Sequence, residues 1–189
     1  CVSFWAVIMS YPKSLDVWLN AIENMLSSIE AILRVPRNNI KQFWMACHAY
    51  VYGLIAVELK RHERKRLKIS IISMNTRNNE FVFKLYARGR VSEGSYFRII
   101  LNDGKRVLRL LLLMNVDCNT IYGDIRLNLD IAFVRESSEY LQAIARDYLV
   151  VRKEDILAFV EVKNLKLSSE LYATVIGQYY LLYGCMRRG

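Results

Sequence analysis

Three charged side chains lie at the borders of two apolar, strand-like segments, and their types are those that bind a divalent cation. Residues 124–134 alternate between polar and apolar types, and Asp130 is the last polar residue of that alternation. Residues 156–163 are apolar on both faces until Glu161 and Lys163, which a period of two places on one face, about 7 Å apart. Because a buried charge needs a partner or a metal, these residues indicate a cation site at the ends of two strands.

The chemistry that such a site could perform is the hydrolysis of a phosphate ester. Mg²⁺ prefers hard oxygen ligands, which Asp130, Glu161 and the Val162 carbonyl would supply. Lys163 could then orient the attacking water and stabilise the charge that grows on the phosphate. We expect the two strands to be neighbours, with the two acidic side chains on the same side of the sheet and their carboxylates within about 6 Å of each other. Two plainer interpretations stay open: Asp130 as an ordinary solvated strand residue, and Glu161 with Lys163 as an ion pair at a frayed strand end.

Helices and short strands must position these residues. Apolar spacing predicts helices over roughly 13–34 and 39–65, and further helices over 138–148 and 168–186. Between them the pattern is typical of short strands, at 68–74, 80–87, 95–101, 106–114, 124–134 and 155–163. The run Asn-Asp-Gly at 102–104 is typical of a hairpin turn. The sequence therefore predicts an α/β fold with an N-terminal helical segment.

The two site segments together resemble the PD-(D/E)xK nuclease superfamily. Its signature is an Asp on one strand, followed on the next strand by Glu or Asp, any residue, and Lys. The matching segments here are LDIAFV at 129–134 and FVEVKN at 159–164, with Leu129 where the signature has Pro. The resemblance covers about 124–183, and the region before it only by the order of a helix and then strands. It implies a restriction-endonuclease-like mixed β-sheet flanked by helices, and cleavage of DNA phosphodiester bonds with Mg²⁺ or Mn²⁺ through Asp130, Glu161 and Lys163.

Two polar residues interrupt apolar helix stripes, and the resemblance offers a role for each. Gln178 lies three residues after Val175 and four before Leu182. Superfamily members similar to RecB nucleases carry a Gln on this helix that reaches the site, usually with Tyr where this chain has Leu182. Glu58 continues the stripe of the second helix, and many members supply an extra metal-binding acid from the first core helix. We expect both to point into the site, although a core Gln and a Glu paired with Arg61 or His62 stay open.

Basic residues outnumber acidic ones, 27 to 18, which gives a net charge of +9 and favours a polyanionic partner such as DNA. Most of the expected phosphate contacts lie where the second helix ends. The residues expected to contact DNA are Lys60, Arg61, Arg64, Lys65, Arg66 and, beyond the last strand, Lys166. A solvated helix end is the alternative interpretation of the run from residue 60 to 68.

Length and composition set the remaining expectations. The chain of 189 residues is expected to form one nuclease-like domain over 1–189, with N-terminal helices in 1–66 and the sheet core with a C-terminal helix in 67–189. No apolar run approaches the roughly 18 residues that cross a bilayer, so we expect no membrane partner and a cytoplasmic location. A homodimer is left open.

Several kinds of site lack support in the sequence. The four cysteines are not at metal-binding spacing, and neither a P-loop nor a dinucleotide-binding motif appears. With His48 and His62 the only histidines, a histidine nucleophile is disfavoured, and we expect His48 to be structural. Two other functions stay open: a non-catalytic DNA-binding protein on the same fold, and a protein-interaction module.

Overall fold

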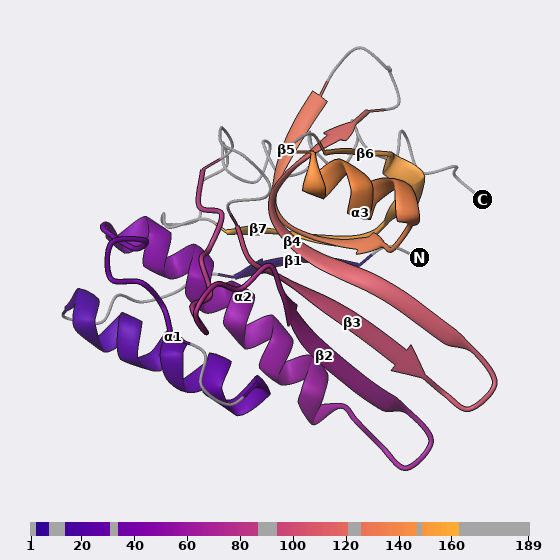
Figure 1. Cartoon of the computed structure of the whole chain (residues 1–189), viewed down its shortest axis with the longest axis horizontal. Coiled ribbons are helices and arrows are strands. Elements are labelled where there is room, and N and C mark those ends of the chain that lie inside the picture. Colours follow the sequence, from indigo (N-terminus) through magenta and orange to yellow (C-terminus); the bar gives the residue numbers. More distant parts are fainter. Residues whose placement is uncertain are drawn as a thin grey trace.

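A mixed β-sheet lies between helices that pack on both of its faces (Figure 1). The computed structural model describes residues 3–7, 14–30, 34–86, 94–120, 126–146 and 149–162. Within these ranges the helices are α1 (Leu15–Ile29), α2 (Phe43–Arg61) and α3 (Ser138–Ala145). The strands of the same ranges are β1 (Ser3–Val7), β2 (Lys68–Met74), β3 (Tyr96–Asn102), β4 (Val107–Asn119), β5 (Arg126–Arg135), β6 (Val150–Val151) and β7 (Ile156–Val162).

Seven strands of the described residues form the sheet in the order β1-β7-β5-β4-β3-β2, with β6 paired to β4. Adjacent strands from β2 to β7 are antiparallel, whereas β1 runs parallel to β7 and β6 runs parallel to β4. The predicted α/β class, with a mixed sheet flanked by helices, is therefore confirmed. In the part of the chain that the structure describes, no helix is long and apolar enough to cross a membrane.

Helices α1 and α2 cover one face of the sheet. In α1 the buried residues Trp18, Ile22 and Leu26 are four positions apart, so they form one stripe that packs toward α2. Helix α2 is buried on most of its sides because it lies between α1 and the sheet. The two helices approach closely at Gly53, where an added Cβ would lie 3.4 Å from Cε of Met25.

Helix α3 packs on the opposite face of the sheet. Its buried residues Tyr140 and Ile144 are one turn apart and belong to the same apolar cluster as Leu111 and Phe159. The helix begins after Ser137, whose hydroxyl accepts a hydrogen bond from the Tyr140 amide at 3.2 Å. The two faces of the sheet thus have separate apolar cores, one beneath α1 and α2 and one beneath α3.

The strand predicted over 80–87 is not present in its described part, residues 80–86, although its alternation of side chains is. Phe81, Phe83 and Leu85 are buried as a period of two predicts. Their backbone is bonded to loops and side chains instead of a strand: Phe83 donates to and accepts from the Asn39 side chain, and the Phe81 amide donates to the Arg34 carbonyl. The prediction was wrong because burial alternation alone does not require a strand partner.

Other boundaries agree more closely with the pattern. β2 spans the predicted residues 68–74, and the Asn-Asp-Gly turn joins β3 to β4 with Gly104 at φ 83°, a conformation that favours glycine. Strand β1 was not predicted. The helix predicted over 168–186 lies outside the described residues.

Candidate active site

The two acids predicted to share a site lie on neighbouring antiparallel strands, β5 and β7. The ladder pairs Ile131 with Val160 and Ala132 with Phe159, so Asp130 and Glu161 are the next residues along their strands. Oδ2 of Asp130 accepts a hydrogen bond of 2.8 Å from the backbone amide of Val162. The expected adjacency of the strands is confirmed. The separation of the two carboxylates and their placement on one side of the sheet stay predictions.

Asp130 lies where the alternation of β4 and β5 is interrupted. The ladder between these strands pairs Met114 with Ile131 and then Val116 with Leu129, leaving out Asn115 and Asp130. On one side of the gap Met114 and Ile131 face the α2 core, and on the other side Val116 and Leu129 face the α3 core. Asp130 therefore belongs to neither regular face, and its carboxylate can reach the edge of β7.

A reciprocal pair of hydrogen bonds supports this interruption. Asn115 has φ 48°, in the left-handed region that Asn tolerates better than most residues, and its side chain is buried. Lys84 Nζ donates to the Asn115 carbonyl at 2.6 Å, and Asn115 Nδ2 donates to the Lys84 carbonyl at 2.6 Å. Burial lowers the pKa of the Lys84 ammonium, while the nearby Asp117 carboxylate opposes that shift. The residues 80–86 are thereby tied to β4 beside the candidate site.

His48 of α2 brings an imidazole to Asp130, which the sequence did not predict. Its Nε2 lies 3.5 Å from Oδ2 of Asp130, and the two side chains are 12% and 16% exposed. Its Nδ1 lies 2.7 Å from the Trp44 carbonyl oxygen, one turn earlier in the helix. Since a carbonyl only accepts, Nδ1 carries the hydrogen, and Nε2 is the nitrogen that faces the acid.

Aromatic packing and a buried hydroxyl hold His48 in place. The Trp44 ring meets the imidazole edge to face at 5.6 Å and the Tyr86 ring at 5.7 Å. One turn after His48, the Tyr52 hydroxyl bonds to β3 and β4, which fixes the helix over the sheet. The position of His48 beside Asp130, in the middle of β5, is therefore set by contacts on both sides of it along α2.

Glu161 is buried near Asp130, but its side chain lies on the face of the sheet opposite to that of its neighbours Val160 and Val162. Its side chain is 1% exposed. Because Val160 and Val162 face the α2 core while Phe159 faces the α3 core, strand alternation places Glu161 on the α3 side. Burial raises the pKa of Cys118 on that side to about 12, and the carboxylates of Asp117 and Glu161 add to the rise. His48 and Glu161 thus approach the Asp130 position from opposite faces of the sheet.

Glu58, expected as a further metal ligand, lies away from this group. Its carboxylate pairs with Arg61 at 2.5 Å, and its side chain is 46% exposed. It follows His48 by ten residues on the same helix, which is about 15 Å at 1.5 Å per residue. The stripe of every third or fourth apolar residue that led to Glu58 was wrong because α2 is buried on most sides, so its apolar pattern does not reveal which side meets the sheet.

The basic residues expected to contact DNA differ in their surroundings. Lys60 is engaged within the protein, since its Nζ donates to Glu63 at 2.6 Å and to the Ile69 carbonyl at 2.8 Å. Arg61 pairs with Glu58. The exposed residues Arg64, Lys65 and Arg66 have no acidic partner among the described contacts. Lys163, Gln178 and Lys166 lie outside the described residues.

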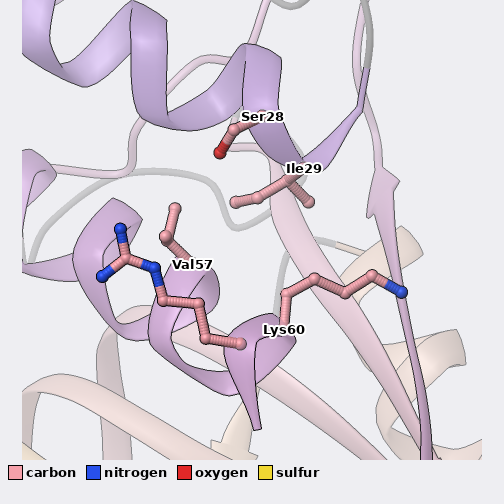
Figure 2. Close-up of a pocket in the computed structure, with 5 residues that line it drawn as sticks. Ser28, Ile29, Val57 and Lys60 are labelled. Carbon is pink, nitrogen blue, oxygen red and sulfur yellow. The ribbon is translucent and has the colours of Figure 1, made fainter. Parts of the chain in front are cut away.

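A surface hollow of about 270 Å³ lies between the ends of α1 and α2, far along α2 from His48. It is lined by Ser28, Ile29, Val57, Lys60 and Arg61 (Figure 2). Figure 2 shows Lys60 directed toward the neighbouring strand, where it bonds to the Ile69 carbonyl. Lys60 is thus engaged within the protein, and Arg61 is bonded to Glu58.

The side chains around Asp130 supply some, but not all, of the ligands of a divalent cation. A carboxylate oxygen, which suits Mg²⁺ and Mn²⁺, lies beside an imidazole nitrogen, which suits Zn²⁺ and other late transition metals better. Within the described ranges no three His, Cys, Asp or Glu side chains gather closely enough to hold a metal ion. Mg²⁺ and similar ions keep several waters and take one or two carboxylates together with substrate phosphates, so a complete protein cage is not required.

Comparisons of the chain with protein-family models, with curated proteins and with solved structures find no match in any of the three.

Proposed function

We propose that this protein is a metal-dependent nuclease that hydrolyses DNA phosphodiester bonds with a PD-(D/E)xK-type site on a restriction-endonuclease-like fold. The observation that supports the proposal most is the 2.8 Å hydrogen bond from the Val162 amide to the Asp130 carboxylate. It brings the Asp of the first segment, 129–134, to the middle residue of the Glu-x-Lys in the second. The two segments are 30 residues apart in the sequence, so their contact is not a consequence of the sequence pattern alone.

Separate roles in metal binding and in phosphodiester hydrolysis are proposed for the residues of the site. Asp130 and Glu161 are the proposed metal ligands, with the Val162 carbonyl as a third oxygen. His48, whose Nε2 lies 3.5 Å from Asp130 on the α2 face, is proposed to orient the Asp130 carboxylate. When bound, a divalent cation lowers the pKa of a coordinated water and neutralises charge on the phosphate. Lys163 is proposed to orient the attacking water and to stabilise the negative charge that develops on the phosphate oxygens.

The described contacts would keep the ligands in place before substrate binds. The Val162 amide holds one oxygen of Asp130, and the Trp44 carbonyl sets the tautomer of His48. The Trp44 carbonyl thereby fixes the orientation of the imidazole beside Asp130, as the outer partners of a metal ligand do. Low exposure of Asp130 and His48 strengthens any electrostatic interaction there.

Substitutions that keep shape but remove charge test the proposal. Asp130→Asn and Glu161→Gln are expected to abolish cleavage of linear, circular, single-stranded and branched DNA in Mg²⁺ or Mn²⁺, as chelator should in wild type. Binding measured in chelator should be kept or become tighter, because each change removes a negative charge near phosphate. Lys163→Ala should abolish turnover while metal binding is retained.

Matched changes at exposed acids serve as controls, since Asp16 and Glu154 lie on the surface. Asp16→Asn and Glu154→Gln should cut at the rate of the wild type. Cleavage that persists in both Asp130→Asn and Glu161→Gln, after removal of contaminating nuclease, would show that the site is elsewhere.

A non-catalytic DNA-binding protein on the same fold is the second candidate. Its support is that the described residues contain no cluster of three metal-binding side chains, although the exposed basic residues after α2 are present. This function requires that wild type binds DNA equally in Mn²⁺ and in chelator and never cuts it.

A further inference from the structure

We infer that two basic segments far apart in the sequence form one phosphate-binding surface at the end of the sheet away from Asp130. We call it the basic tip, and its residues are Arg64, Lys65, Arg66, Lys68, Lys105 and Arg106. The inference rests on the proposed function, because it concerns how far the DNA extends from the phosphate that is cut.

Strand register brings the two segments together. Lys68, at the start of β2, pairs with Asn102 at the end of β3, and Asn102 pairs with Val107 at the start of β4. The turn that enters β2 and the hairpin turn that joins β3 to β4 therefore lie at the same end of the sheet. Figure 1 shows both turns projecting at that end, beside the last turn of α2.

Local hydrogen bonds present the basic side chains of each turn to solvent. Arg64 and Leu67 exchange backbone hydrogen bonds of 2.9 and 3.0 Å, which leaves Lys65 and Arg66 at the tip of a tight turn. In the hairpin, Asp103 Oδ1 accepts the amides of Lys105 and Arg106 at 2.8 and 2.7 Å. These bonds lower the pKa of Asp103, and its carboxylate is engaged by the amides of the turn.

The charge balance at this end is strongly positive. Residues 61–68 contain five Lys or Arg and one Glu, and residues 102–109 contain three Lys or Arg and one Asp. The one Glu, Glu63, already bonds Lys60 and lies 3.9 Å from Lys68. Arg64, Lys65, Arg66, Lys105 and Arg106 are exposed, and the described part of the chain holds no acidic partner for them. Such a surface attracts a polyanion.

Two independent paths give the distance from the basic tip to the candidate active site. Along α2, Arg61, the last residue of the helix and three residues before the tip, follows His48 by 13 residues, which is about 20 Å at 1.5 Å per residue. Along β4, Met114 follows Val107 by seven residues, which is about 24 Å at 3.4 Å per residue. Because base pairs of a duplex are about 3.4 Å apart along its axis, the tip would contact phosphates roughly six or seven base pairs from the one at Asp130.

A duplex is the occupant that this spacing favours. A DNA duplex is rigid and regularly charged, so one duplex can reach both the basic tip and the candidate active site at Asp130. Contacts to its phosphates fix the position of the protein on the DNA without reading the base sequence. Val107 and Leu108 are also exposed beside the tip, 51% and 37%, and apolar residues next to cations suit an anionic membrane as well. Vesicles therefore form one arm of the test.

The test compares neutralisation of the tip with an equal loss of charge elsewhere. The tip variant combines Lys65→Gln, Arg66→Gln, Lys105→Gln and Arg106→Gln. The control combines Arg37→Gln, Arg77→Gln, Arg135→Gln and Arg146→Gln, which are exposed positions outside the tip. Affinity is measured in chelator, over a range of salt, for hairpin-closed duplexes of about 6 and about 24 base pairs, lengths chosen from the rise per base pair.

We expect the tip variant to bind the long duplex at least about tenfold more weakly. Its plot of log affinity against log salt concentration should be less steep by the slope of about three phosphate contacts, each of which contributes about 0.9. Its affinity for the short duplex should equal that of the control. An equal loss on short and long duplexes, no loss on the long one, or a loss confined to phosphatidylserine vesicles would overturn the inference.

The outcomes for the nuclease are separate from those for the tip. Because the binding measurement contains no metal, a length-dependent loss supports the tip even if wild type never cuts DNA. Conversely, metal-dependent cutting that is lost in Asp130→Asn, with no effect of the tip variant on long duplexes, would support the nuclease and contradict the tip.

Discussion

The Tyr52 hydroxyl donates a hydrogen bond of 2.7 Å to the carbonyl of Leu112 in the interior of the protein. The same oxygen accepts the amide of Phe97 at 3.0 Å, and Phe97 and Leu112 face each other across β3 and β4. The hydroxyl thus bridges two strands, and its burial raises the pKa of Tyr52, so it stays protonated. Since His48 precedes Tyr52 by one helical turn, this bridge fixes where the imidazole lies along the sheet.

Tyr52→Phe is expected to lower the free energy of unfolding by about 1–3 kcal/mol, because it leaves a buried amide and carbonyl without the bridging hydroxyl. Urea denaturation measures the change. Tyr50→Phe is the control, since Tyr50 contacts Trp18 through its ring. An unchanged midpoint in Tyr52→Phe would show that β3 and β4 close a direct hydrogen bond in its place.

His48→Asn is expected to weaken Mn²⁺ binding by at least about tenfold, the usual effect of losing an outer partner that orients a metal ligand, because His48 Nε2 lies 3.5 Å from the proposed ligand Asp130. Calorimetry or the electron paramagnetic resonance signal of Mn²⁺, without DNA, measures the affinity. His62→Asn removes the other histidine, which is exposed after α2, and should bind Mn²⁺ as wild type does. Equal Mn²⁺ affinity in both variants would remove His48 from the metal site.

Arg98→Met is expected to destabilise the protein by about 1.5–3 kcal/mol, as loss of hydrogen bonds between charged groups does. Arg98 binds Glu136 through Nε at 2.6 Å and a terminal nitrogen at 2.5 Å, and the Glu136 side chain is only 9% exposed. Chemical denaturation at neutral pH is the measurement. Glu154→Gln, in a pair 3.9 Å apart that is largely exposed, should change stability by less than about 0.5 kcal/mol.

Cys118 and Cys47 are expected to resist thiol reagents at pH 8 in the folded protein, because burial raises the pKa of both, that of Cys118 to about 12. The folded-state pKa exceeds the unfolded value of about 8.5, so their contribution to stability is complete below that value and is lost as pH rises toward 12. Labelling with and without urea, in a Cys1→Ser, Cys185→Ser background, measures reactivity. Rapid labelling of the folded protein would contradict the described burial.

Features that depend on local pattern could be predicted from the residues alone. An alternating apolar run predicted β2 over 68–74, and the Asn-Asp-Gly turn predicted the hairpin of β3 and β4. Polar residues at the ends of apolar segments identified Asp130 and Glu161 as unusual, and the structure places them on neighbouring strands. These features were readable because strand period and turn conformation depend on a few consecutive residues.

Contacts between residues of distant segments could not be predicted in this way. Helix α2 is buried on most sides, so its apolar pattern could not show that His48 and not Glu58 faces Asp130. Nor could the sequence place the turns that carry Lys65 and Lys105 at the same end of the sheet, because strand register sets that arrangement. Such contacts depend on how helices and strands are packed, and the free energy of packing comes from the whole core and not from any local segment.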